Sequence, residues 1–576
     1  MTSDPHQKEA PRASLLPFIL CTAALLATLF VRLTRGLDVT DEIQYYGEIK
    51  GLLESGHLFS TDLFIQQSVY VLLYPAFLLH HAWAGFDGLV LFGRLLMSGL
   101  SLALFLYAYN RLRALDTTPW QASLASLLIT FAVPYHGVLA PSYNTISQAT
   151  WIVFALSFLA WRIRSPLYWA ALPVVTAFAH PTAAVTMSLL IFGRQLHERD
   201  FKQAFKFGVS AGLGALLMLA VLTCFASPSE FVRSLAFSSG YGVGTVFFSG
   251  HSGPTTLAEI YVLFMIAAWS SKLSSRYKLP LLLMAMIWLT VRNLRHPFPG
   301  AYDGYSARTA LLLAGLSALA YAGALARVSQ APGLLTRRHV HWFAVFLLIY
   351  ATTLGVTSGN GIGQATGAFM VGLPLLLAIA CPQADPDSSS RIPQTLGVAS
   401  MVLVAIWTVG HWCRYPYREA PWWKTNQAVA DIPEFRFIST SAERAKLLSD
   451  VRATLLPDTQ NKKVLIVSEY PGFYFASGGS IESCMVYMHS LTSDKSESAL
   501  KDCLRNKHPD VVVDVFKNDE QAYQGDRLKA VMRQFYADAY PDCKRSVLDL
   551  APHSDLNPTR LVMRVCKPRP IASIQP

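Results

Sequence analysis

Three carboxylates lie within five residues of one another, directly after the first long apolar segment of the chain. They belong to Asp38, Asp41 and Glu42. Ionisable side chains near membrane depth usually serve a function, because charge is costly to place there. A carboxylate at the mouth of a cavity can act as a general base or bind a metal ion. We expect Asp41 to be the base, with Asp38 and Glu42 as its neighbours.

A purely structural role for this cluster is the alternative. Asp41 would be a suitable N-cap if a helix starts there and continues through Leu53. Carboxylates this close together repel one another, so we expect the pKa of one of them to be raised.

The composition indicates which kind of scaffold holds the cluster. Of the 576 residues, 52% are hydrophobic and only 15% are charged, and the mean hydropathy is +0.33. Soluble domains carry about 25% charged residues. The sequence therefore excludes an ordinary soluble enzyme, a disordered chain and a fibre, and predicts a polytopic membrane protein. The net charge of +11 does not indicate nucleic-acid binding, because excess Lys and Arg mostly set orientation in such proteins.

The charged residues divide the chain into two domains. Residues 1–412 hold 42 of them, whereas the much shorter stretch 413–576 holds the other 43 and has the charge density of a soluble domain. We expect a mainly α fold: a membrane helical bundle over 1–412, with its first outer loop at 34–87, followed by a soluble domain over 413–576. Short strands alternate with helical stretches such as 497–506 and 526–537 in this tail, which predicts a small α/β domain.

About thirteen apolar windows are predicted to be membrane-spanning helices, although several are shorter than the roughly 20 residues that a typical span needs. The windows are 14–33, 88–109, 120–134, 145–161, 166–179, 181–193, 207–225, 256–271, 279–291, 309–326, 341–357, 366–381 and 394–412.

One further apolar run, 69–83, decides the orientation. If it does not cross the membrane and the N-terminus lies inside, 17 of the 25 Lys and Arg in residues 1–412 fall on the cytoplasmic side. If it crosses, only 7 do. The positive-inside rule favours the first arrangement. We therefore predict that 69–83 is a juxtamembrane or re-entrant segment and that the tail lies outside.

The cysteines of the tail agree with an outer location. Cys484, Cys503, Cys543 and Cys566 are an even set of four, which in an oxidising compartment can form two disulfides in any of three pairings. The tail has no C-x-x-C pair, which argues against a structural zinc site.

The residues after the first span resemble a known superfamily, the C-type (GT-C) glycosyltransferases. The matching features are the outer Asp41-Glu42 pair, the aromatic residues Tyr45 and Tyr46, and the Arg94-Leu95 that opens the second span. Protein O-mannosyltransferases and lipid A aminoarabinose transferases belong to this superfamily. The tail segments 464–467, 474–478, 484–489 and 508–513 are similar to the small α/β domain that many of these enzymes carry outside the membrane.

The resemblance implies an activity. Such enzymes transfer a sugar, a hexose or a pentose, from a polyprenyl-phosphate carrier to a glycan, lipid or protein acceptor at the outer face of the membrane. It implies a multi-pass protein of the bacterial inner (plasma) membrane whose active site and C-terminal domain face the periplasm. The acceptor hydroxyl must lose its proton as it attacks the anomeric carbon, which is the role that we expect for Asp41.

A phosphate leaving group requires cations. Few Lys or Arg are predicted on the outer side, and arginine matches phosphate oxygens well. The candidates are Arg292, Arg295 and Arg308 around one outer loop, with His296 assisting, and Arg94 at the start of the second span. Snorkelling of these side chains to lipid headgroups is the alternative.

Outer loops supply further candidates for substrate binding. Tyr143 and Asn144 follow the third span, and Tyr45 and Tyr46 follow the acidic pair. Some superfamily members have an acidic residue, sometimes a metal ligand, in the loop where this chain has Asn144. A divalent metal is therefore doubtful as a cofactor, and we assign no metal ligand.

Other functions fit the sequence less well. A transporter or flippase of a lipid-linked sugar should show internal repeats and broken helices at the bilayer midplane, and the sequence shows no clear halves. A polysaccharide polymerase or ligase usually concentrates its chemistry in a large late outer loop, whereas the acidic cluster here lies in the first. A scaffold would not need three carboxylates at this position.

Overall fold

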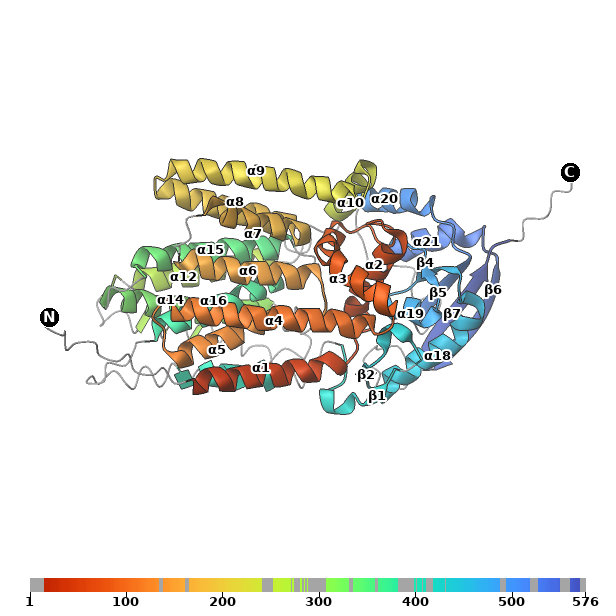
Figure 1. The fold of residues 1–576 in the computed structure, drawn as a ribbon, viewed down its shortest axis with the longest axis horizontal. Coiled ribbons are helices and arrows are strands. Elements are labelled where there is room, and N and C mark those ends of the chain that lie inside the picture. Colours follow the sequence, from red (N-terminus) through yellow and green to blue (C-terminus); the bar gives the residue numbers. More distant parts are fainter. Residues whose placement is uncertain are drawn as a thin grey trace, which may run out of the picture.

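The protein is described by a computed structural model (Figure 1). It describes residues 15–576 except for 134–137, 161–164, 241–251, 271, 274–279, 282–283, 285–286, 289–306, 331–334, 358–360, 382–397, 400, 407, 411–417, 430, 487–493, 518–526, 550–559 and 570–576.

Long apolar helices form a bundle, as the sequence predicts. Eleven of the thirteen predicted windows are helices. A twelfth, 394–412, contains the shorter apolar helix Met401–Gly410, and the window 279–291 lies largely outside the described residues. The bundle helices are α1 (Leu16–Thr34), α4 (Leu89–Arg113), α5 (Pro119–Thr130), α6 (Tyr143–Ala160), α7 (Pro166–Ala179), α8 (Pro181–His197), α9 (Phe201–Thr223), α12 (Ser252–Ser270), α14 (Ala307–Gln330), α15 (Arg337–Thr357) and α16 (Ala365–Ala380).

Six of these helices are long and apolar enough to cross a membrane: α1, α4, α9, α14, α15, and α16 with the 3-10 turn η4 (Gly361–Gln364) before it. The outermost of them leave large apolar side chains uncovered. On α9, Leu213, Leu216 and Leu217 are exposed by 63%, 64% and 66%. Water would make such a surface unfavourable, whereas lipid solvates it well. The chain is therefore a multi-pass membrane protein.

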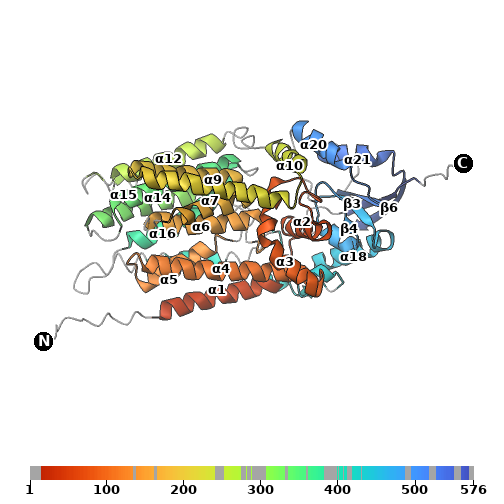
Figure 2. The same cartoon turned by 45° about the horizontal axis from the view of Figure 1, so that its top comes forward.

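The segment between α1 and α4 stays at one end of the bundle. It contains α2 (Asp41–Ser55), the 3-10 helix η1 (Ile65–Val69) and α3 (Tyr70–Ala84). Arg94, near the start of α4, donates hydrogen bonds to the carbonyls of Arg32 and Leu33 at the end of α1. The two spans thus enter and leave at the same end, in agreement with the prediction that 69–83 does not cross. Figures 1 and 2 show α2 and α3 between the bundle and the C-terminal domain.

The C-terminal domain is built on a five-stranded sheet in the order β4-β3-β5-β7-β6. Strand β3 (Lys463–Val467) runs parallel to β4 (Ser480–Ile481) and β5 (Val511–Lys517), whereas β7 (Arg560–Lys567) runs antiparallel to β5 and β6 (Asp542–Asp549). The predicted α/β character is confirmed. The predicted boundary at 412/413 lies outside the described residues.

Helices cover both faces of this sheet. Val513 of β5 belongs to the same hydrophobic cluster as Leu447 of α18 (Ala442–Thr459), whereas its neighbour Val512 clusters with Leu500 of α20 (Asp494–Leu504) and Val531 of α21 (Arg527–Ala537). Successive side chains of a strand point to opposite faces, which produces this division. The smaller elements are α10 (Pro228–Gly240), α19 (Gly472–Ser477), η5 (Trp422–Lys424), η6 (Pro433–Phe435), β1 (Gln427–Ala428) and β2 (Ser439–Thr440).

Helix α2 is held between the bundle and the C-terminal domain. Every residue from 42 to 52 is buried, although the helix carries Glu42, Glu48 and Lys50. The Lys50 ammonium lies 2.6 Å from the Glu434 carboxylate of the tail, and the two side chains are 8% and 7% exposed. Charges are rarely buried unless they are paired. The C-terminal domain therefore supplies a partner that α2 requires.

The four cysteines of the tail form two disulfides, Cys484–Cys503 and Cys543–Cys566. The second joins the paired strands β6 and β7. This resolves the three pairings that the sequence leaves open.

We predict that the double variant Cys484→Ser/Cys503→Ser lowers the stability of the C-terminal domain by about 3 kcal/mol. The disulfide closes a loop in the unfolded chain and lowers its entropy, a loss equivalent to roughly this free energy. Thermal unfolding of the purified protein measures the loss. Cys224→Ser, which removes an exposed free cysteine, is the control. An unchanged melting temperature in the double variant would contradict the assignment.

Candidate active site

Asp38 organises the start of α2. Its carboxylate accepts hydrogen bonds from the backbone N–H groups of Glu42 (3.0 Å) and Thr40 (3.1 Å) and from the Thr40 hydroxyl (2.5 Å). The N-cap residue is Thr40, and Asp41 is the first residue of the helix. An N-cap role for Asp41 is therefore wrong, because Asp38 supplies the capping oxygen from three residues earlier. Burial and the neighbouring Asp41 raise the pKa of Asp38 to about 6, against the opposing effects of Arg418 and Thr40.

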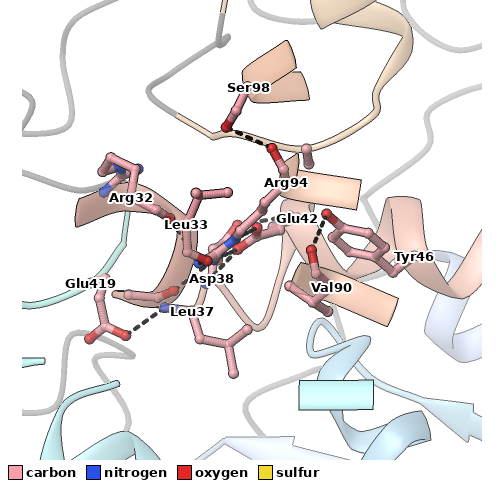
Figure 3. A network of polar contacts seen from close by, with 12 residues as sticks. Arg32, Leu33, Leu37, Asp38, Glu42, Tyr46, Val90, Arg94, Ser98 and Glu419 are labelled. Carbon is pink, nitrogen blue, oxygen red and sulfur yellow. Dashed lines mark hydrogen bonds and ion pairs between the residues drawn. The ribbon is translucent and has the colours of Figure 1, made fainter. Parts of the chain in front are cut away.

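Glu42 forms a buried ion pair with Arg94. The Arg94 Nε and Nη2 atoms each donate to a Glu42 oxygen at 2.8 Å, and both side chains are at most 5% exposed. Arg94 also donates to the carbonyls of Arg32, Leu33 and Gly36. Figure 3 shows the Arg94 and Glu42 side chains meeting close to Asp38.

This network uses the whole guanidinium group. An arginine has five N–H donors, and the hydrogen bonds that Arg94 donates match that number. In this arrangement Arg94 ties the end of α1, the following loop and α2 to α4. A phosphate could reach it only by displacing protein acceptors. Arg94 and Glu42 therefore serve to hold these segments together.

Asp41 differs from its two neighbours. Its side chain is 23% exposed, and its Oδ1 atom lies 3.5 Å from Nη1 of Arg418 in the segment after the bundle. Asp38 and Glu42, by contrast, are at most 4% exposed. Asp41 is thus the most exposed carboxylate of the cluster.

A small pocket lies beside this cluster. It is lined by Arg32, Gly36, Leu37, Asp38, Glu42, Arg94, Val138, Leu139 and Glu419. The lining brings together the first outer loop, α4, the residues before α6 and the tail.

The predicted aromatic residues fall into two groups. Tyr46 is fully buried; its hydroxyl donates to the Val90 carbonyl at 3.0 Å, and its ring lies so close to Gly93 that a Cβ there would be 2.5 Å away. It is part of the contact between α2 and α4. Tyr45 lies one turn from Asp41 and packs edge-on against Tyr143, with ring centroids 6.1 Å apart.

Asn144 joins the second group, because its amide donates to the Tyr45 hydroxyl at 3.5 Å. Tyr45, Tyr143 and Asn144 therefore form one surface between α2 and the start of α6. The structure brings these three predicted residues together.

Of the cations that the sequence predicts around the outer loop 292–308, Arg308 is the one that falls in the described part of the chain. Arg308 is an exposed residue at the start of α14. Arg292, Arg295 and His296 lie outside the described residues.

A second acidic site lies further along α2, and the sequence reasoning missed it. Glu48 is buried and accepts hydrogen bonds from the Gln44 amide (2.9 Å) and the Tyr70 hydroxyl (2.6 Å). Asp62 is fully buried and accepts backbone N–H groups from Phe64 and Val486. Burial raises the pKa of Glu48 to about 7; burial and Glu48 hold the pKa of Asp62 well above its usual range. The spacing of seven residues from Asp41 to Glu48, two helical turns, is the signal that could have revealed it.

Groups of three or more His, Cys, Asp or Glu side chains arranged to hold a metal ion do not occur among the described residues.

Among known proteins, the chain is similar to solved structures but matches none in a comparison of sequences. No family model and no curated protein matches the chain. Two solved structures of ArnT from Cupriavidus metallidurans are similar, one bound to undecaprenyl phosphate and one in the apo state. The first is 14% identical with a TM-score of 0.40 and covers 96% of this chain and 98% of that one; for the second the values are 14%, 0.38, 95% and 97%. Similarity at this level does not assign the chain to a family.

We predict that Glu42→Gln destabilises the folded protein by about 3–5 kcal/mol, because removing one partner of a buried ion pair leaves the other charge uncompensated. Replacing both residues, as Glu42→Gln/Arg94→Met, should cost less than the sum of the single changes. Melting temperatures of detergent-solubilised single and double variants measure this coupling. Strictly additive effects would show that Glu42 and Arg94 do not stabilise each other in the folded protein.

The buried Glu48 predicts a pH dependence of stability. Its pKa rises from 4.5 to about 7 on folding, so the folded state binds the proton more tightly. The resulting stabilisation is complete below pH 4.5 and is lost as the pH rises through 7. Asp62, whose pKa is also raised, acts in the same direction.

We therefore expect the melting temperature of the wild type to fall between about pH 5 and 7 more steeply than that of Glu48→Gln. Asp87→Asn, which changes an exposed carboxylate paired with Arg436, serves as the control. Parallel curves for the wild type and Glu48→Gln would refute the burial of an ionisable group here.

Proposed function

We propose that the protein is a membrane glycosyltransferase. It transfers a sugar from a polyprenyl-phosphate-linked donor to an acceptor at the periplasmic face of a bacterial inner membrane, with inversion at the anomeric carbon. The observation that carries this proposal is the greater exposure of the Asp41 side chain. Of the three clustered carboxylates it is the one within reach of a substrate, while Asp38 and Glu42 are buried and hydrogen-bonded.

Asp41 is the base in this mechanism. Its carboxylate takes the proton of the acceptor hydroxyl as that oxygen attacks the anomeric carbon. The bond between the anomeric carbon and the phosphate oxygen breaks on the opposite face, and the lipid phosphate leaves with the electron pair. One glycosidic bond forms, one glycosyl-phosphate bond breaks, and the proton ends on Asp41.

The surrounding residues hold this carboxylate in place. The Asp38 cap fixes the first turn of α2, and the Glu42–Arg94 pair fixes that turn against α4. A misplacement of about 1 Å can cost a factor of about 10² in rate, so such positioning matters. Tyr143 and Asn144, which are partly exposed and contact the buried Tyr45 one helical turn from Asp41, offer a ring and an amide to a sugar.

A lipid-linked donor agrees with the scaffold. The polyprenyl chain would lie in the bilayer against the spans, while its phosphate would meet the arginines of the predicted outer loop 292–308. Arg308, Arg292, Arg295 and His296 are the proposed contacts to that phosphate. Undecaprenyl phosphate, the lipid held by the similar ArnT structure, is a suitable probe.

The two disulfides support the periplasmic location of the tail. Disulfides persist in oxidising compartments and are rare in the cytosol. The excess of Lys and Arg on the opposite side of the bundle supports the same orientation.

We predict that Asp41→Asn abolishes sugar transfer, with a loss of about 10²-fold or more, while the protein still inserts and melts as the wild type does. Transfer of a labelled sugar from a membrane lipid extract into acceptor fractions measures the rate. Asp87→Asn, a change of an exposed carboxylate on the same loop, should leave it intact. Full activity of Asp41→Asn would remove the base assignment, and transport without transfer in liposomes would favour a flippase.

A further inference from the structure

The segment that follows the bundle reaches back onto the candidate base. Nη1 of Arg418 lies 3.5 Å from Oδ1 of Asp41 and donates a 2.7 Å hydrogen bond to the hydroxyl of Thr40. Its side chain is 34% exposed. Arg418 thus contacts the two residues at which α2 begins, although it is separated from Thr40 by 378 positions in the sequence.

The backbone at Arg418 is held in an uncommon conformation. Its φ angle is +49°, in the left-handed region that residues other than glycine rarely adopt. Such conformations persist where the surroundings enforce them, and they cluster at functional sites.

The enforcing contacts come from α18 and Glu419. Arg444 of α18 donates to the carbonyls of both Arg418 and Leu37. Glu419 pairs with Arg444 at 3.3 Å and accepts the backbone N–H of Leu37 at 3.0 Å; the Glu419 and Arg444 side chains are at most 4% exposed. A buried charge pair thus joins the C-terminal domain, the segment at 418–420 and the first outer loop.

We propose that Arg418 is a positioning residue that orients the Asp41 carboxylate, and that docking of α18 through Arg444 sets it in place. The C-terminal domain would then contribute a residue to the active site in addition to covering it. This inference rests on the proposed function, because it gives Arg418 a task in the same reaction.

The charged groups around Asp41 show which charge a substitution of Arg418 would remove from its surroundings. Asp38 lies beside it on the loop, Glu42 is neutralised by Arg94, and Glu419 is neutralised by Arg444. Arg418 is thus a cation that the tail contributes directly to Asp41. Because it is one-third exposed, its replacement should leave the protein folded.

The test compares Arg418→Gln, Arg418→Lys and the wild type in the lipid-linked sugar transfer assay. We expect Arg418→Gln to lower kcat by about 10- to 100-fold, as for a misplaced reacting group, with the KM for the donor nearly unchanged. Arg418→Lys should recover part of the loss. Arg436→Gln is the matched control, because Arg436 is also a tail arginine that pairs with a carboxylate of the first outer loop, that of Asp87. This variant should keep wild-type kcat.

Wild-type kcat in Arg418→Gln, or a rise in donor KM alone, would overturn the proposal. Absence of transfer by the wild type would instead refute the proposed function. In that case amide hydrogen exchange decides the positioning claim. Faster exchange over residues 38–46 in Arg418→Gln than in Arg436→Gln supports it, and equal exchange overturns it.

Discussion

The buried ion pair between Glu42 and Arg94 is the interaction on which the arrangement of the site depends. Two charges at most 5% exposed are stable only because they face each other and because Arg94 also binds three carbonyls. Those carbonyls belong to the end of α1 and the loop after it. One guanidinium group therefore fixes where the first span ends, where α2 starts and how α4 packs.

The same requirement for paired charge explains why the C-terminal domain sits where it does. Helix α2 buries Lys50, which needs Glu434, and the loop before it is bound by Glu419 and Arg444. Burying such groups without partners would be costly, so the bundle and the tail are linked through α2. The Phe475 and Phe86 rings flank the Lys50 ammonium and complete the apolar surroundings.

The sequence predicted the elements better than the contacts between them. Hydropathy located the spans, and charge asymmetry indicated that the α3 region does not cross. The carboxylate cluster pointed to the candidate site, but Asp38 as the cap and Arg94 as a partner of Glu42 depend on the turn at 38–41 and on the packing of α4. Arg418 and Arg444 could not be predicted, because only folding brings them to a loop near the opposite end of the chain. Glu48 could have been predicted, since it lies two turns from Asp41 on one helix.

The most direct test of this mechanism is a cryo-electron microscopy structure of the protein in lipid nanodiscs with a polyprenyl phosphate bound. We predict phosphate density beside Asp41, at the end of the bundle that carries the C-terminal domain, with the Glu42–Arg94 pair intact. Phosphate density at the opposite end of the bundle, or bound directly by Arg94 in place of Glu42, would contradict it.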